Sequence, residues 1–152
     1  MGEPLTQTRV ILDTDLAMGA PGSDIDDGFA LAMAVADPML RLELVTTVGG
    51  NTDVATATTL SRRLLGTLGY PEVPVVQGAP GPLDPRWRRP DRAVSAAAPP
   101  AGGAGDRHAA AELAARVLAE PGEITVVAIG PLDATYTERL ADAFLRAVRA
   151  RG

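Results

Sequence analysis

The sequence of 152 residues contains no cysteine and no lysine. The absence of cysteine excludes disulfide bonds and thiolate metal ligands, and it fits a reducing, cytoplasmic compartment. The absence of lysine means that all 14 basic residues are arginine. This excludes chemistry that depends on a lysine, such as Schiff-base formation or phosphate binding by a P-loop lysine.

Long apolar runs and an excess of positive charge are also absent. No stretch approaches the roughly 18 apolar residues that cross a bilayer, and the N-terminus lacks the basic and apolar regions of a signal peptide. The net charge of −5 argues against a nucleic-acid partner, which needs phosphate neutralisation. The length and the 46% hydrophobic content therefore predict one globular domain over residues 1–152, with neither a membrane nor a nucleic acid as partner.

Apolar runs of strand type alternate with segments of helical period along the chain. This alternation predicts an α/β fold with a parallel, Rossmann-like sheet and flanking helices. A long, flexible surface loop without periodicity is expected at 79–106, and a lid is the alternative interpretation of this segment. The expected strands are 9–13, 41–48, 73–76 and a buried one at 124–129, and the expected helices are 26–36, 53–68, 107–119 and 137–149.

The first expected helix carries apolar residues at helical spacing, among them Ile25, Phe29 and Met33. Together with Ala32 and Ala36 they predict a stripe that faces the core.

Five aspartates surround the loop between the first strand and this helix. Asp13 and Asp15 follow the strand, whereas Asp24, Asp26 and Asp27 stand at the start of the helix. One interpretation is a solvated acidic loop next to a helix N-terminus, where the helix dipole favours aspartate. The other is a site for a cation or a polyol, and the position of two acids directly after a buried strand favours it.

Ligands of parallel sheets bind beyond the carboxyl ends of the strands. That edge is where we expect Asp13, Asp15, Asn51 and the backbone at Ile129–Gly130 to converge.

Four segments carry a family resemblance. They are Asp13-Thr14-Asp15 with Asp26-Asp27-Gly28-Phe29-Ala30-Leu31, then 46–51 (TTVGGN), 73–79 (VPVVQGA) and 127–132 (VAIGPL). In this order they resemble the signatures of the inosine-uridine-preferring nucleoside hydrolases, which serve purine and pyrimidine salvage. The resemblance implies calcium-dependent hydrolysis of the N-glycosidic bond of a ribonucleoside, yielding base and ribose.

The resemblance also implies roles for single residues. Asp15 would be a calcium ligand and the base that takes a proton from the attacking water. Asp27 would be a second ligand, and the backbone carbonyl of Ile129 a third.

For the ribose, the resemblance implies that Asp26 and Asn51 hydrogen-bond its hydroxyl groups. Asp13 would support the site from behind. An N-glycosidic bond breaks through an oxocarbenium-like state, so an activated water and nearby negative charge suit this chemistry.

The sequence departs from the family pattern in ways that leave alternatives open. The loop between Asp15 and Asp26 is long, so Asp24 competes for a site position. Family members continue through a second half with a further metal aspartate and a histidine, whereas His108 here is expected to cap a helix or lie on the surface. One alternative is an inactive fragment that binds ribose or calcium and forms a homo-oligomer through an unpaired sheet edge. The other is a haloacid-dehalogenase-like phosphatase, although the lysine that such enzymes use is missing here.

Overall fold

The computed structural model describes residues 7–20, 22–78 and 109–131. The loop expected at 79–106, His108 and the helix expected at 137–149 lie outside the described residues. None of the described helices is long and apolar enough to cross a membrane. The elements are β1 (Thr8–Thr14), α1 (Asp26–Ala36), β2 (Leu40–Thr47), α2 (Val54–Leu68), β3 (Val75–Gln77), α3 (Ala109–Ala119) and β4 (Ile124–Ala128).

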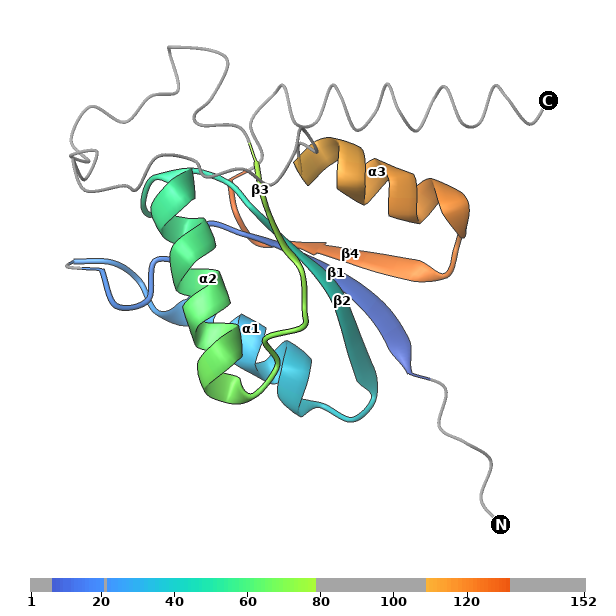
Figure 1. The fold of residues 1–152 in the computed structure, drawn as a ribbon, viewed down its shortest axis with the longest axis horizontal. Helices are drawn as coiled ribbons and strands as arrows, with labels where there is room; N and C mark the ends of the chain where they lie inside the picture. Colours follow the sequence, from blue (N-terminus) through green and yellow to red (C-terminus); the bar gives the residue numbers. More distant parts are fainter. Residues whose placement is uncertain (1–6, 21, 79–108, 132–152) are drawn as a thin grey trace.

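The strands form one parallel sheet in the order β3-β2-β1-β4. Helices α1 and α2 cover one face of this sheet, and α3 lies on the other (Figure 1). This arrangement confirms the predicted α/β class with a parallel sheet and flanking helices. All predicted strands and helices within the described residues are present, with ends that differ by at most two residues from the expected ones.

The core consists of two apolar clusters separated by the sheet. The larger one lies between the sheet and helices α1 and α2, and it includes Leu12, Leu31 and Leu65. The smaller one, with Ile11, Leu44 and Leu113, lies under α3. Strand β1 therefore contributes alternate side chains to both faces, as a central parallel strand does.

Helix α2 begins and ends as its sequence predicts. Asp53 is its N-cap and accepts a hydrogen bond from the backbone N–H of Thr56 (2.9 Å). Gly69 follows the last turn with a φ of 90°, a conformation in which glycine has no Cβ penalty.

The predicted core-facing stripe of α1 is wrong. Ile25, Phe29 and Met33 are exposed by 53%, 55% and 70%, and Ala36 is exposed as well. The buried face of α1 instead carries Asp27, Gly28, Leu31 and Ala34. The helix is apolar on both sides, and it is turned so that a carboxylate at its start faces the end of β1.

The prediction that the fourth strand is buried is also wrong. Strand β4 pairs in parallel with β1, yet its residues from Thr125 to Ala128 are exposed. Among the described residues nothing pairs with its other side.

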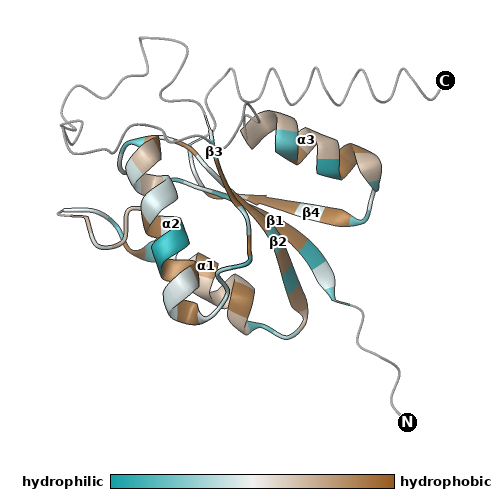
Figure 2. Ribbon diagram, viewed as in Figure 1, coloured by the Kyte–Doolittle hydropathy of each residue, from teal (hydrophilic) through white to brown (hydrophobic). Residues whose placement is uncertain are grey.

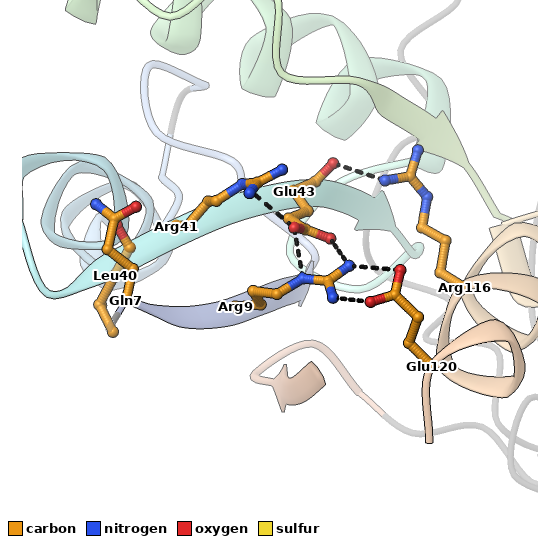
Figure 3. A network of polar contacts seen from close by, with 7 residues as sticks. All are labelled: Gln7, Arg9, Leu40, Arg41, Glu43, Arg116 and Glu120. Atoms are coloured by element: carbon orange, nitrogen blue, oxygen red, sulfur yellow. Dashed lines mark hydrogen bonds and ion pairs between the residues drawn. The ribbon is translucent and has the colours of Figure 1, made fainter. Parts of the chain in front are cut away.

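A polar network lies on the α3 face, near the amino ends of the strands (Figure 3). Arg9 on β1 holds Glu43 on β2 through two hydrogen bonds of 2.7 and 3.0 Å and also pairs with Glu120 after α3. Arg41 lies 3.3 Å from the same Glu43 carboxylate, and Arg116 donates to the Glu43 backbone carbonyl (3.0 Å). The network thus ties two strands to the end of α3.

A register shift in β2 directs Glu43 into this network. Val10 pairs with Leu42, whereas the next residue, Ile11, pairs with Leu44. Glu43 is therefore the extra residue of a β-bulge, a feature that re-aims side chains.

We expect Glu43→Gln to lower the free energy of unfolding at pH 7 by about 1–3 kcal/mol, because its hydrogen bonds are charge-assisted and its side chain is 8% exposed. The hydrogen bonds from Arg9 hold the pKa of Glu43 below its usual range. Its contribution is therefore present above the unfolded-state pKa near 4.5 and is lost as the pH falls through the folded-state value. Urea unfolding between pH 3 and 7 measures both effects.

The matched control is Glu120→Gln, because this partner of Arg9 has a side chain that is 51% exposed. Its effect should be clearly smaller than that of Glu43→Gln, because water screens an exposed ion pair. Equal losses in the two variants would contradict the central place of Glu43 in the network.

Candidate functional site

Two of the aspartates lie at the carboxyl end of strand β1, and both are buried. Asp13 is 2% exposed and Asp15 is 5% exposed, so neither belongs to a solvated loop. Thr46, the neighbour of Asp13 on β2, donates its hydroxyl proton to Asp13 Oδ1 over 2.6 Å. This bond holds the Asp13 side chain against β2 within the sheet.

Asp15 lies against the loop that follows β2. Its Oδ2 atom accepts a hydrogen bond of 2.6 Å from the backbone N–H of Asn51. A Cβ atom at Gly50 would lie only 2.1 Å from the same oxygen and 2.6 Å from Pro131 Cγ. The glycine therefore lets the loop approach the carboxylate closely, as a backbone does at a bulky or charged ligand site.

Asp27 completes a pair of buried carboxylates. It lies in the first turn of α1 and is 5% exposed, and its Oδ2 atom is buried without a hydrogen-bond partner in the described part of the chain. Burial raises the pKa of Asp27 to about 7, and a hydrogen bond with Asp15 and the negative charge of Asp15 add to this effect. Two carboxylates this close cannot both ionise at low cost unless a cation joins them.

The backbone after β4 reaches the same edge of the sheet. The N–H groups of Ile129 and Gly130 both donate to the carbonyl of Asp13, over 2.9 and 3.2 Å. Gly130 fits so closely that a Cβ atom would lie 2.5 Å from Val48 Cγ1 and 3.1 Å from the backbone nitrogen of Asp15. The three strands β2, β1 and β4 thus end side by side at the carboxylate pair.

The other two acids of the loop stay outside this pair. Asp24 and Asp26 are exposed, and Asp27 is the residue that faces Asp15. Of the three acids at the start of α1, Asp27 is therefore the one that is buried beside Asp15.

The oxygen atoms of Asp15 and Asp27 are suited to bind a hard cation, but they are too few to form a complete coordination shell. Carboxylate and carbonyl oxygens are the ligands that calcium prefers, six to eight at a time. The orphaned oxygen of Asp27 and its proximity to Asp15 fit such an ion. However, the described residues contain no group of three or more histidine, cysteine, aspartate or glutamate side chains that could hold a metal.

Sequence reasoning missed two residues of this site. Thr46 looked like an ordinary β-branched strand residue, and only its parallel pairing with Asp13 gives it a role. Gly50 looked like a turn residue, whereas its missing side chain is what admits the Asp15 carboxylate.

The comparisons with known proteins agree with one another. A family model described as inosine-uridine preferring nucleoside hydrolase matches residues 10–134. Uridine nucleosidase 1 from Arabidopsis thaliana is 35% identical over 132 residues, which cover 82% of this chain and 37% of the plant protein. Non-specific ribonucleoside hydrolase RihC from Escherichia coli (strain SMS-3-5 / SECEC) is 37% identical over 134 residues, covering 81% of this chain and 40% of the relative.

Solved structures agree with the sequence matches. A plant nucleoside hydrolase, the PpNRh1 enzyme, superimposes with a TM-score of 0.67 at 30% identity, covering 94% of this chain and 43% of the plant chain. An inosine-guanosine nucleoside hydrolase gives a TM-score of 0.65 at 25% identity. This chain spans about two fifths of the length of the curated relatives that it matches, at their N-terminal portion.

Proposed function

The chain belongs to the inosine-uridine preferring nucleoside hydrolase family, and on this premise we propose that it binds calcium and the ribose of a ribonucleoside in order to hydrolyse the N-glycosidic bond. The observation that carries the proposal is the buried pair of Asp15 and Asp27 at the carboxyl edge of a parallel sheet. No structural need of the fold explains two adjacent buried carboxylates, whereas a cation does.

In this proposal Asp15 and Asp27 provide carboxylate ligands, and Ile129 provides its backbone carbonyl. Calcium, when bound, would supply positive charge that lowers the pKa of a water molecule beside it. Asp15, which the N–H of Asn51 holds in place, would accept a proton from that water. The negative charge that remains on the two carboxylates would stabilise the positive charge that develops on the sugar in the oxocarbenium-like transition state.

The exposed position of Asp26 next to Asp27 suits it to accept hydrogen bonds from ribose hydroxyl groups. Asn51 is half-buried beside Asp15 and is proposed to do the same. Asp13, fixed by Thr46, supports the backbone on which both β1 and the Ile129–Gly130 turn depend.

A second function is favoured by the small number of ligands in the described residues. A site of two carboxylates and one carbonyl can bind calcium and ribose without turning over a nucleoside. This would make the chain a binding protein that shares the family fold.

Calorimetric titration with calcium, with and without ribose, tests binding. We expect a weak site with a Kd on the order of 10⁻³ M, and ribose should tighten it. Asp15→Asn is expected to abolish the heat of binding, whereas the exposed Asp24→Asn should retain it. Calcium affinity that is unchanged in Asp15→Asn would overturn the metal assignment.

Incubation with uridine and inosine, followed by chromatography of the released base, separates the two functions. Base release that stops on calcium removal supports hydrolysis. Calcium and ribose binding without base release supports the binding function.

A further inference from the structure

The loop that joins β2 to α2, residues 48–53, is bonded to the end of β1 at two points. The backbone N–H of Val48 donates to the carbonyl of Thr14 over 3.1 Å, and the N–H of Asn51 donates to Asp15 Oδ2 over 2.6 Å. The loop must therefore keep its conformation for Asn51 to hold the Asp15 carboxylate in place.

One buried hydroxyl group is bonded to the residues at both ends of this loop. Helix α2 carries pale and teal bands between its brown ones (Figure 2), and one of its polar side chains, Thr58, is 2% exposed. Thr58 Oγ1 donates to the carbonyl of Val54, the residue directly after the loop, over 2.6 Å. The same oxygen lies 2.7 Å from Oγ1 of Thr47, the residue directly before the loop.

The direction of these two hydrogen bonds follows from the number of protons. A hydroxyl group has one proton to donate, and a backbone carbonyl can only accept. Because Thr58 gives its proton to Val54, the proton between the two hydroxyl groups comes from Thr47. Thr47 is 1% exposed, so without the Thr58 oxygen its hydroxyl would be a buried donor that has lost its acceptor, which is unfavourable.

The sheet holds Thr47 firmly in place. Thr47 pairs with Thr14 of β1, and its carbonyl accepts a hydrogen bond of 2.9 Å from the N–H of Gly78 after β3. Gly78 lies so close that a Cβ atom there would be 2.3 Å from the Thr47 carbonyl oxygen. The bond between the two hydroxyl groups therefore connects the first turns of α2 to a fixed point of the sheet.

A hydrogen bond from threonine to the carbonyl four residues earlier is common in helices and does not by itself indicate a role. Thr59 and Thr67 make this bond too, to Ala55 over 2.9 Å and to Arg63 over 3.0 Å, and both are exposed. Thr58 differs from them because it is buried and also accepts a proton from a strand.

We propose that Thr58 is a positioning residue, whose hydroxyl group joins the two ends of the 48–53 loop and thereby keeps Asn51 against Asp15. Thr58 acts through the loop and not on a ligand directly. Its effect on calcium and ribose binding rests on the proposed function, whereas its effect on the loop does not.

Amide hydrogen exchange of Asn51, followed by NMR on the full chain, tests this proposal. Thr58→Val keeps the branched shape of the side chain and removes the hydroxyl group. We expect exchange of the Asn51 N–H to become about five- to tenfold faster, which corresponds to the net loss of one hydrogen bond. Exchange of Leu12 in the core of β1 reports unfolding of the whole domain and should change less. Thr47→Val removes the donor of the same bond and should have the same effect on Asn51.

Two matched variants separate positioning from packing. Thr59→Val removes a bond of the same kind at an exposed position, and it should leave the exchange of Asn51 unchanged. Thr58→Ser removes the methyl group but keeps the hydroxyl group, and it should retain slow exchange. A role limited to core packing predicts the opposite order, with Thr58→Ser more harmful than Thr58→Val.

Calorimetric titration with calcium, with and without ribose, measures the consequence for binding. Ribose should tighten calcium binding less in Thr58→Val than in Thr59→Val. A chain that binds neither ligand would contradict the proposed function, and the exchange of Asn51 would still decide the role of Thr58.

Unchanged exchange of Asn51 in both Thr58→Val and Thr47→Val, with the chain folded, would overturn the proposal. An equally fast exchange in Thr59→Val, or in Thr58→Ser, would also overturn it. So would an acceleration at Asn51 that is no larger than the one at Leu12, because the substitution would then have lowered only the stability of the whole domain.

Discussion

Replacing Asp27 with asparagine is expected to stabilise the metal-free protein at pH 8 and to remove its response to calcium. The asparagine side chain is close in shape to a protonated aspartate but carries no charge beside Asp15. Burial and Asp15 raise the pKa of Asp27 to about 7 from an ordinary value of 3.8. The folded protein therefore holds this proton more tightly than the unfolded chain does.

The direction of the pH effect follows from this difference. The contribution of protonated Asp27 to stability is fully present below about pH 4 and is lost as the pH rises through about 7. The difference between the two pKa values corresponds to at most about 4 kcal/mol. We expect Asp27→Asn to be more stable than the original chain at pH 8 by about 1–3 kcal/mol, and to be nearly equal to it at pH 4.

Urea unfolding at pH 4 and pH 8, with and without about 10 mM calcium, measures the effect. Calcium should stabilise the original chain at pH 8 by about 1–2 kcal/mol for a Kd near 10⁻³ M, and it should not stabilise Asp27→Asn. Asp24→Asn is the control, because its side chain is exposed and lies outside the pair. An Asp27→Asn protein that is destabilised at pH 8, or that is still stabilised by calcium, would contradict the role of the pair.

Gly50→Ala is expected to weaken calcium binding by about tenfold or more and to destabilise the fold by about 1–3 kcal/mol. The added methyl group would lie 2.1 Å from Asp15 Oδ2 and 2.6 Å from Pro131 Cγ. Because the carboxylate is held by Asn51 N–H at 2.6 Å, it can move away only by giving up this hydrogen bond. The substitution would therefore displace Asp15 Oδ2, the proposed ligand atom, and break the hydrogen bond from Asn51 that holds it.

The control for this substitution is Gly66→Ala in α2. No atom lies within 4 Å of a Cβ at Gly66, and alanine in a helix interior is more favourable than glycine by about 0.5–1 kcal/mol. Calorimetry and urea unfolding should therefore show unchanged calcium binding and a small gain in stability for Gly66→Ala. A Gly50→Ala protein with the original calcium affinity would show that Asp15 is not a ligand.

The positions of the helices and strands were predictable from the sequence, because the residues that mark their ends act locally. Asp53 and Gly69 are side-chain and backbone signals for helix ends that act within one turn, and α2 begins and ends beside them. The alternation of strands and helices was sufficient to predict a parallel sheet. A helix that connects two neighbouring parallel strands makes a crossover that is nearly always right-handed.

The orientation of α1 could not be predicted in the same way. Leu31 and Ala34 face the sheet while Phe29 and Met33 face outward, so hydropathy offers two apolar faces and cannot choose between them. The side that faces the sheet also carries Asp27 beside Asp15, and Gly28, where a Cβ atom would lie 2.3 Å from Met18 Sδ. A carboxylate on the buried face is a feature that a hydropathy pattern rejects, and such conflicts are expected at functional sites.

The sequence was sufficient to predict at which edge of the sheet the candidate site lies. Topology brings Asp13, Asp15, Asn51 and the Ile129–Gly130 backbone together, as expected for strands that end side by side. The individual contacts were not predictable, because residue types alone do not indicate that the backbone N–H of Asn51 donates to Asp15. Distances of this kind depend on loop conformation, which residue types alone do not determine.

The sheet order also has a consequence for synthesis on the ribosome. Strand β2 follows β1 closely, so the unit from β1 to β2 can fold soon after it emerges. The other neighbour of β1 is β4, which begins about 110 residues after β1 ends. At roughly 5–20 residues per second, translation reaches β4 only about 5–20 seconds later. During that interval one side of the central strand is unpaired in the nascent chain, and this side is where chaperones are expected to bind.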